Sequence, residues 1–92
     1  MVEHARAGAS FEDADVVSNY RYRPPYPEAV YEKLLAITPK RGCLLDIGCG
    51  PGKVSRPLSR HFDKVIAVDP SRHMIELGQS LEDGRARNLH WI

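Results

Sequence analysis

The chain has 92 residues, of which 42% are hydrophobic and 27% are charged, and its 13 basic and 12 acidic residues leave a formal charge of +1. This length fits one small domain, or part of a larger one, and excludes a second domain; the globular, nearly neutral composition predicts no nucleic-acid partner and no membrane surface. Two cysteines are too few for a disulfide framework or a four-ligand zinc site, the histidines lack metal-ligand spacing, and no signal-peptide run opens the chain, so we predict a cytoplasmic protein without a metal.

Residues 1–25 are expected to form a mobile N-terminus and a lead-in segment. The first nine residues are small and polar and follow no hydrophobic period. Ser10 to Asp13 have the spacing of a capping box, which predicts a short helix near 11–20. Residues 20–27 contain three prolines, and each residue before a proline is disfavoured in the helical region, so this stretch is expected to be irregular or extended.

Residues 26–92 show the alternation of a parallel α/β sheet. Pro27 is expected to open a helix, because proline suits a first turn, and this helix has one apolar face made of Val30, Tyr31, Leu34, Leu35 and Ile37. The apolar run 43–47 then predicts a strand that is buried on both faces. After a tight loop over 48–52, the apolar residues Val54, Leu58 and Phe62 predict a helix that ends near 61–63.

The same alternation continues to the last residue. Residues 65–68 predict a second buried strand, because they are rich in β-branched side chains and stop at Asp69-Pro70-Ser71. A helix with Met74, Ile75 and Leu77 facing inward is expected next, capped by Asp69 or Ser71, and residues 89–92 open a third strand. Alternating strands and helices are typical of right-handed crossovers in a parallel sheet.

The strongest functional signal is a glycine-rich loop between the first strand and the next helix. It reads Asp46-Ile47-Gly48-Cys49-Gly50-Pro51-Gly52, and a second acid, Asp69, ends the following strand. Glycines let the backbone turn sharply and let a ligand approach the peptide groups closely. A carboxylate at the end of the second strand can accept hydrogen bonds from both hydroxyls of a ribose. Together these residues predict a site for an adenosine cofactor.

The loop differs from the two common phosphate-binding motifs. In the dinucleotide fingerprint a glycine stands three residues after the second one, whereas here Lys53 has that place. A P-loop needs four residues between its glycines and Ser or Thr after the lysine, but Val54 follows Lys53. Asp46 would repel a pyrophosphate and attract the α-ammonium group of an amino acid, although Lys53 favours phosphate. S-adenosylmethionine carries such an ammonium group, and an NAD(P)-dependent oxidoreductase fragment is the less favoured alternative.

Two segments of the sequence resemble motifs of class I S-adenosylmethionine-dependent methyltransferases. These segments are residues 45–52 and residues 65–71 with Met74, and residues 11–27 are similar to the lead-in of small-molecule methyltransferases of the trans-aconitate methyltransferase-like group. The resemblance covers residues 11–92 and implies the N-terminal half of a Rossmann-like S-adenosylmethionine-binding domain. The cofactor-binding residues it implies are Asp46, Gly48, Cys49, Gly50, Gly52, Asp69, Pro70, Ser71, Met74, Tyr20, Arg23 and Tyr26.

The resemblance also implies that some parts of a complete enzyme lie outside this half of the domain. The sheet is expected to be truncated after about strand three, and residues that bind the small-molecule methyl acceptor are expected beyond Ile92, so no catalytic residue is assigned. Without its usual neighbour, the first strand would have an apolar edge that predicts a homo-oligomer. A non-catalytic binding or assembly module with the same fold is the alternative function.

Overall fold

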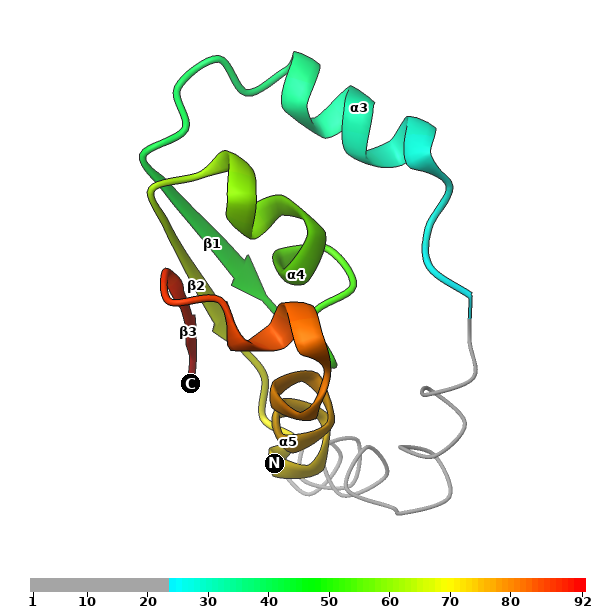
Figure 1. Ribbon diagram of the computed structural model, residues 1–92, viewed down its shortest axis with the longest axis vertical. Helices are drawn as coiled ribbons and strands as arrows, with labels where there is room; N and C mark the ends of the chain where they lie inside the picture. The colour runs from blue at the N-terminus through cyan, green and yellow to red at the C-terminus, as the bar shows by residue number, and fades with distance from the viewer. Residues whose placement is uncertain (1–23) are drawn as a thin grey trace, which may run out of the picture.

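Three parallel strands form one sheet, in the spatial order β1-β2-β3 (Figure 1). The computed structural model describes residues 24–92, so the helix predicted near 11–20 lies outside the described residues. Strand β1 comprises Cys43–Ile47, β2 comprises Lys64–Val68 and β3 comprises Leu89–Trp91. The parallel α/β architecture expected from the sequence is therefore confirmed.

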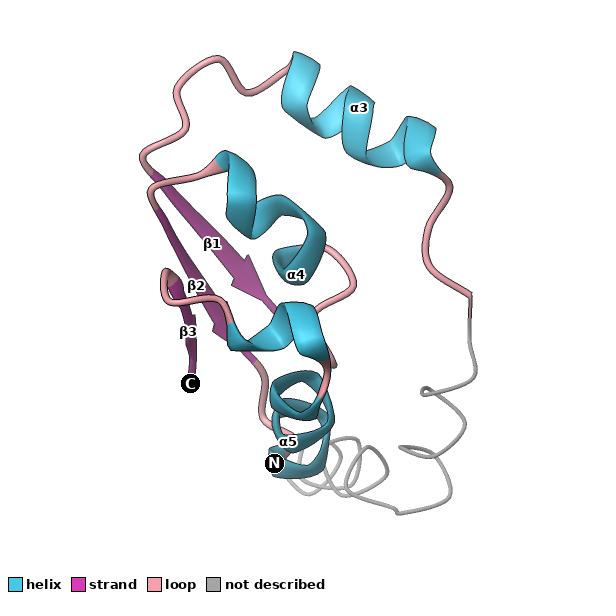
Figure 2. Cartoon of the chain, viewed as in Figure 1, coloured by secondary structure: helices cyan, strands magenta, loops and turns pink. Residues whose placement is uncertain are grey.

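One face of the sheet is covered by helices. Leu44, Val65 and Leu89 are in register on the same face; Val65 and Leu89 belong to the hydrophobic core, and Leu44 packs against it. Helix α4 (Ser55–Leu58) and helix α5 (Arg72–Ser80) lie on this side of the strands (Figure 2). Val65 and Ala67 of β2 are fully buried beneath them.

The opposite face of the sheet is open among the described residues. Leu45 and Ile47 of β1 point to this face, and 56% and 76% of their surfaces are exposed. Strand β1 is also the edge of the sheet, since β2 is its hydrogen-bonded neighbour on one side and no strand within 24–92 pairs with the other. The prediction that β1 is buried on both faces is therefore wrong for residues 24–92, because their helices cover only one side.

Helix α3 (Glu28–Ala36) precedes the sheet and packs against the hydrophobic core through one side. Pro27 is the N-cap residue, one position before the first turn, and the side chain of Tyr31 is buried while Leu34 and Leu35 pack against the core. Val30 and Ile37 are exposed, contrary to the predicted apolar face. They lie roughly 100° or more around the helix from Tyr31, so only part of the apolar surface can face the core.

The helix after the glycine loop is shorter than predicted. Helix α4 ends at Leu58 and continues as the 3-10 turn η1 (Ser59–His61). The side-chain amide of Asn88 donates to the carbonyl oxygens of Ser59 (2.6 Å) and Phe62 (2.8 Å), which satisfies backbone groups at the end of this segment. Leu58 and Phe62 are still buried, as their spacing predicted.

Helix α5 begins at a side-chain cap and leads to the third strand. The hydroxyl oxygen of Ser71 accepts a hydrogen bond from the Met74 amide (3.2 Å), so Ser71 is the N-cap residue. Met74 and Leu77 face the interior as predicted, and the 3-10 turn η2 (Glu82–Arg85) connects α5 to β3. Within the described range 24–92, no helix is long and apolar enough to cross a membrane.

Candidate functional site

The glycine-rich loop follows β1 and turns sharply at three positions. Gly48, Gly50 and Gly52 have φ angles of 73°, 55° and 81°, in the left-handed region that favours glycine. The amides of Gly48 and Cys49 both donate to the carbonyl oxygen of Val68, at 2.7 and 3.0 Å. These bonds tie the loop to the end of β2, so the loop and the acid that follows β2 share one framework.

The backbone amides of the loop are already hydrogen-bonded within the protein. Besides the two amides bonded to Val68, the Gly52 amide donates to the Cys49 carbonyl (3.0 Å), and the Gly50 amide donates to Oδ2 of Asp69 (2.8 Å). Pro51 has no amide hydrogen to donate. Loops that bind phosphate direct several backbone amides at the anion. The amides of residues 48–52 are already engaged, which disfavours a phosphate ligand at this loop.

Asp69 lies directly after β2 and has hydrogen-bonding capacity to spare. Its Oδ2 atom accepts the Gly50 amide and its Oδ1 atom accepts the Ser71 amide, both at 2.8 Å. A carboxylate offers about four acceptor positions, so each oxygen can accept one more hydrogen bond. Two free acceptor positions on one partly exposed carboxylate suit the two hydroxyls of a ribose.

Asp46 is the second acid of the site and lies one residue before the end of β1. Its Oδ2 atom accepts a hydrogen bond from the hydroxyl of Ser55 (2.6 Å), the first residue of α4. Ser55 is fully buried, and this bond fixes the orientation of the carboxylate against the start of α4. Sequence reasoning missed Ser55, because a lone serine at a helix start carries no signal beyond helix capping.

The two acids give the loop a negative environment. Burial raises the pKa of the Cys49 thiol to about 12, and the carboxylates of Asp46 and Asp69 add to this shift. The thiol therefore stays protonated at neutral pH, where it donates to the Gly50 carbonyl oxygen (3.2 Å). Because these carboxylates disfavour a thiolate, they also disfavour a pyrophosphate and favour a cation.

One side of the loop is open and the other is packed. A β-carbon built at Gly48 or Gly50 would meet no atom within 4 Å, so a ligand can approach the backbone there. A β-carbon at Gly52 would lie 2.5 Å from the indole ring of Trp91, so Gly52 faces the interior. Two carboxylates beside open glycine backbone fit an adenosine cofactor that carries an amino-acid group.

Lys53, whose charge favoured phosphate, interacts with the lead-in segment. Its ammonium group donates to the Pro24 carbonyl oxygen (2.9 Å) and lies 5.8 Å from the centre of the Tyr26 ring, within the range of a cation–π contact. The Tyr31 hydroxyl donates to the Lys53 carbonyl oxygen (2.8 Å). Tyr26 is thus placed next to the end of the glycine loop, while Tyr20 and Arg23 lie outside the described residues.

The remaining predicted cofactor residues, Pro70, Ser71 and Met74, lie before and at the start of α5. Pro70 is exposed in the connection between β2 and α5, whereas Ser71 and Met74 are buried at the start of α5. Only 1% of the Met74 surface is accessible, so its side chain belongs to the interior. Contacts of these three residues with a cofactor stay predictions.

A comparison with known protein families identifies the family of the chain. A family model described as a methyltransferase domain matches residues 20–90. The chain belongs to this methyltransferase family. The match includes both acids, the glycine loop, β1, β2 and the first two residues of β3, and it contains the segments in which the sequence resembled a methyltransferase.

Individual relatives of this methyltransferase domain agree with the family match. CRG1 of Saccharomyces cerevisiae, named as an S-adenosylmethionine-dependent methyltransferase, is 34% identical over 62% of this chain and 20% of its own length. The methyltransferase pgmE of Aspergillus terreus is 32% identical over 75% of the chain and 23% of its own length. The chain therefore spans about a fifth of the length of these curated relatives.

A solved structure gives the same result in three dimensions. A protein from Anaeromyxobacter dehalogenans, titled as a type II methyltransferase, has 37% sequence identity and a TM-score of 0.61. The alignment covers 77% of this chain and 28% of that protein. The Rossmann-like methyltransferase fold is thus shared, and this chain corresponds to a minor part of the larger protein.

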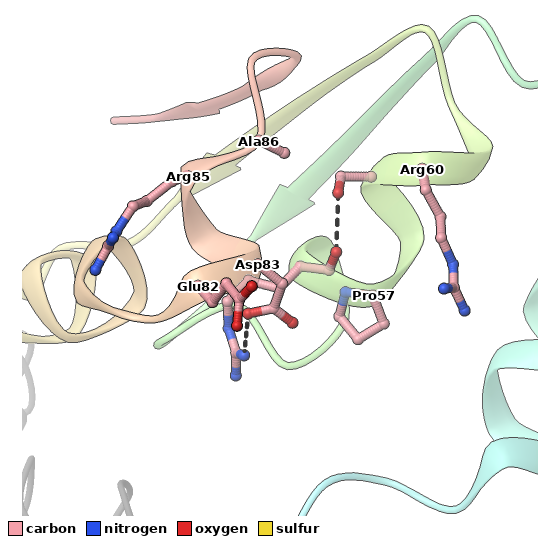
Figure 3. A pocket seen from close by; sticks show the side chains of 8 residues that line it. Pro57, Arg60, Glu82, Asp83, Arg85 and Ala86 are labelled. Carbon is pink, nitrogen blue, oxygen red and sulfur yellow. Dashed lines mark hydrogen bonds and ion pairs between the residues drawn. The ribbon is translucent and has the colours of Figure 1, made fainter.

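A hollow of this methyltransferase domain lies away from the predicted cofactor residues. It has a volume of about 450 Å³ between α4 and η2, and its lining includes an ion pair of 2.8 Å between Arg56 and Asp83 (Figure 3). Charges of both signs surround it, and none of the predicted cofactor residues lines it. Among residues 24–92, no group of three or more His, Cys, Asp or Glu side chains is placed to hold a metal ion.

Proposed function

We propose that this methyltransferase domain binds S-adenosylmethionine at the glycine loop and supplies the cofactor-binding half of an enzyme that methylates a small molecule. The observation that carries the proposal is the arrangement of the loop: its amides are bonded internally, its open side is bare glycine backbone, and two carboxylates flank it. This arrangement favours a cofactor with a ribose and a cationic amino group over one with phosphates.

Each residue of the site has a separate role in binding the cofactor. Asp69 accepts hydrogen bonds from the ribose hydroxyls while it holds the Gly50 and Ser71 amides. Asp46, oriented by Ser55, attracts the α-ammonium group of the methionyl end. Gly48 and Gly50 leave the space that a side chain would fill.

The chemistry of the reaction comes largely from the cofactor. S-adenosylmethionine would supply a methyl group activated by its sulfonium: the acceptor's nucleophile would bond to the methyl carbon as the carbon–sulfur bond breaks, and S-adenosylhomocysteine would leave. The residues of the chain contribute by fixing the position of the cofactor relative to the acceptor. Cys49 takes no nucleophilic part, because its raised pKa keeps the thiol protonated at neutral pH.

The small-molecule acceptor and a cytoplasmic location are further parts of the proposal. The acceptor class rests on the similarity of residues 11–27 to the lead-in of small-molecule methyltransferases. The contacts of Lys53 with Pro24 and Tyr26 bring the end of that lead-in next to the glycine loop.

Calorimetric titration tests the cofactor class. The full chain is titrated separately with S-adenosylhomocysteine, the demethylated product, and with NADH. We expect saturable binding of S-adenosylhomocysteine, and NADH affinity that is lower by about a hundredfold, because a pyrophosphate meets two carboxylates and no free loop amide. Equal or tighter binding of NADH would contradict the proposal and favour the oxidoreductase alternative.

A further inference from the structure

The indole ring of Trp91 fills the space behind the glycine loop. Trp91 is the last residue of β3, and the strand register places it in one row with Ala67 and Asp46 on the covered face of the sheet. Ala67, the middle residue of this row, is fully buried and has a small side chain. The row therefore has room for the large ring to reach from β3 toward the loop.

Glycines of two other elements surround this ring. A β-carbon at Gly52 of the loop would lie 2.5 Å from atom Cη2 of Trp91, and a β-carbon at Gly78 of α5 would overlap the same atom. The indole Nε1 donates to the Gly84 carbonyl oxygen of η2 (2.9 Å). The ring is thus held by a hydrogen bond at its nitrogen and by close packing at its six-membered part.

The carbonyl group of Pro51 is fixed at the same place. Its oxygen accepts a hydrogen bond from Nε of Arg56 (2.8 Å), and it would lie 2.7 Å from a β-carbon at Gly78. The packed side of the loop therefore rests on Trp91, α5 and Arg56. On the other side, Gly48 and Gly50 are open.

We infer that Trp91 is a positioning residue, whose ring holds the loop in the conformation that binds the cofactor. The inference rests on the proposed function for the identity of the ligand, although the packing behind the loop does not depend on it. A loop that is already fixed loses less conformational entropy on binding, so it binds more tightly than a mobile one. Removal of the indole should therefore loosen Gly50 and Gly52 and weaken the binding of the cofactor.

Amide hydrogen exchange in the ligand-free full chain tests the effect on the loop. The variants are Trp91→Leu, Trp91→Phe and, as a control, Val65→Ala, which removes core volume from β2 at the end of the sheet away from the loop. We expect Trp91→Leu to speed exchange at Gly50 and Gly52 about tenfold more than at Val68, with Trp91→Phe in between. Equal acceleration of loop and β2 amides, as expected for Val65→Ala, would overturn the inference.

Calorimetry with S-adenosylhomocysteine gives the second readout. Trp91→Leu should weaken binding about tenfold, Trp91→Phe less, and Val65→Ala by no more than twofold at a temperature where all variants are folded. If Trp91→Leu does not fold, Trp91→Phe decides the question in both experiments. If the unmodified chain binds no S-adenosylhomocysteine, the proposed function fails while the exchange rates still test Trp91. Unchanged affinity in a folded Trp91 variant would overturn the positioning role.

Discussion

The Gly50 amide donates to the Asp69 carboxylate at 2.8 Å and thereby joins the middle of the glycine loop to the end of β2. The same carboxylate accepts the amide of Ser71, the N-cap residue of α5. Asp69 is therefore both a support for the loop and a potential ligand of a ribose. This double role means that a change at Asp69 affects every ligand that carries an adenosine.

Asp69→Ala should weaken the binding of both S-adenosylhomocysteine and 5′-methylthioadenosine. Both ligands carry the ribose, and hydrogen bonds to a charged group contribute about 1.5–3 kcal/mol each, so we expect affinity to fall at least about tenfold for each ligand. Calorimetry measures the affinities. Asp63→Ala, an exposed acid at the other end of β2, serves as the control and should leave both unchanged.

Asp46→Asn should separate the two ligands. The substitution removes the charge that attracts the α-ammonium group, so S-adenosylhomocysteine should bind about tenfold more weakly. 5′-Methylthioadenosine has no amino-acid group, and its affinity should change less than twofold. A loss of equal size for both ligands would assign Asp46 to the structure of the loop instead of to the methionyl end.

Gly50→Ala should lower the stability of the chain even without a ligand. The φ angle of Gly50 is 55°, and a left-handed conformation costs a residue with a β-carbon about 1–2 kcal/mol. Gly42→Ala is a matched control, because a β-carbon there meets nothing within 4 Å and its φ is not positive. Urea unfolding should show that loss for Gly50→Ala and a change within about 1 kcal/mol for Gly42→Ala.

The two cysteines should differ in reactivity and in their effect on alkaline stability. Iodoacetamide at pH 8 should modify the exposed Cys43 and spare Cys49, as mass spectrometry can determine, because burial raises the pKa of Cys49 to about 12. A pKa raised from the ordinary value of 9.0 in the folded state stabilises the fold below about pH 9, and this contribution is lost as the pH rises toward 12. Cys49→Ala should therefore show a shallower loss of stability in that range.

The open face and edge of β1 predict self-association of the 92-residue chain. Leu45 and Ile47 expose apolar surface beside an unpaired strand edge within the described residues, and a second copy could pair with that edge. Light scattering during gel filtration should detect a dimer or larger species that becomes monomeric in Leu45→Lys. Ile37→Lys changes another exposed apolar residue, at the C-cap of α3, and should leave the association unchanged.

Local signals in the sequence predicted the position of the strands and of the glycine loop. The bounds Cys43–Ile47 follow from an apolar run between glycines, and the turns at Gly48, Gly50 and Gly52 follow from the conformational freedom of glycine. The exposure of Leu45 and Ile47 could not be predicted in the same way. An apolar run does not reveal whether one or both faces of its strand are covered, since coverage depends on residues distant in the chain.

Contacts between distant residues also explain what was missed at the site. The end of the segment after the loop depends on Asn88, whose amide bonds to Ser59 and Phe62. The packing of Trp91 behind Gly52 brings together residues that no local pattern connects. Lys53 favoured phosphate in the sequence, but in the fold its ammonium group is bonded to Pro24. These features depend on tertiary structure and carry no periodicity.

The most direct test of the account is an NMR titration of the isotopically labelled chain with S-adenosylhomocysteine. The account predicts saturable shifts of the Gly48, Gly50 and Asp69 amides, at the open side of the loop, with little change at Arg60 and Asp83 around the hollow between α4 and η2. Shifts confined to Arg60 and Asp83, or no saturable shift in a folded chain, would contradict the assignment of the glycine loop as the cofactor site.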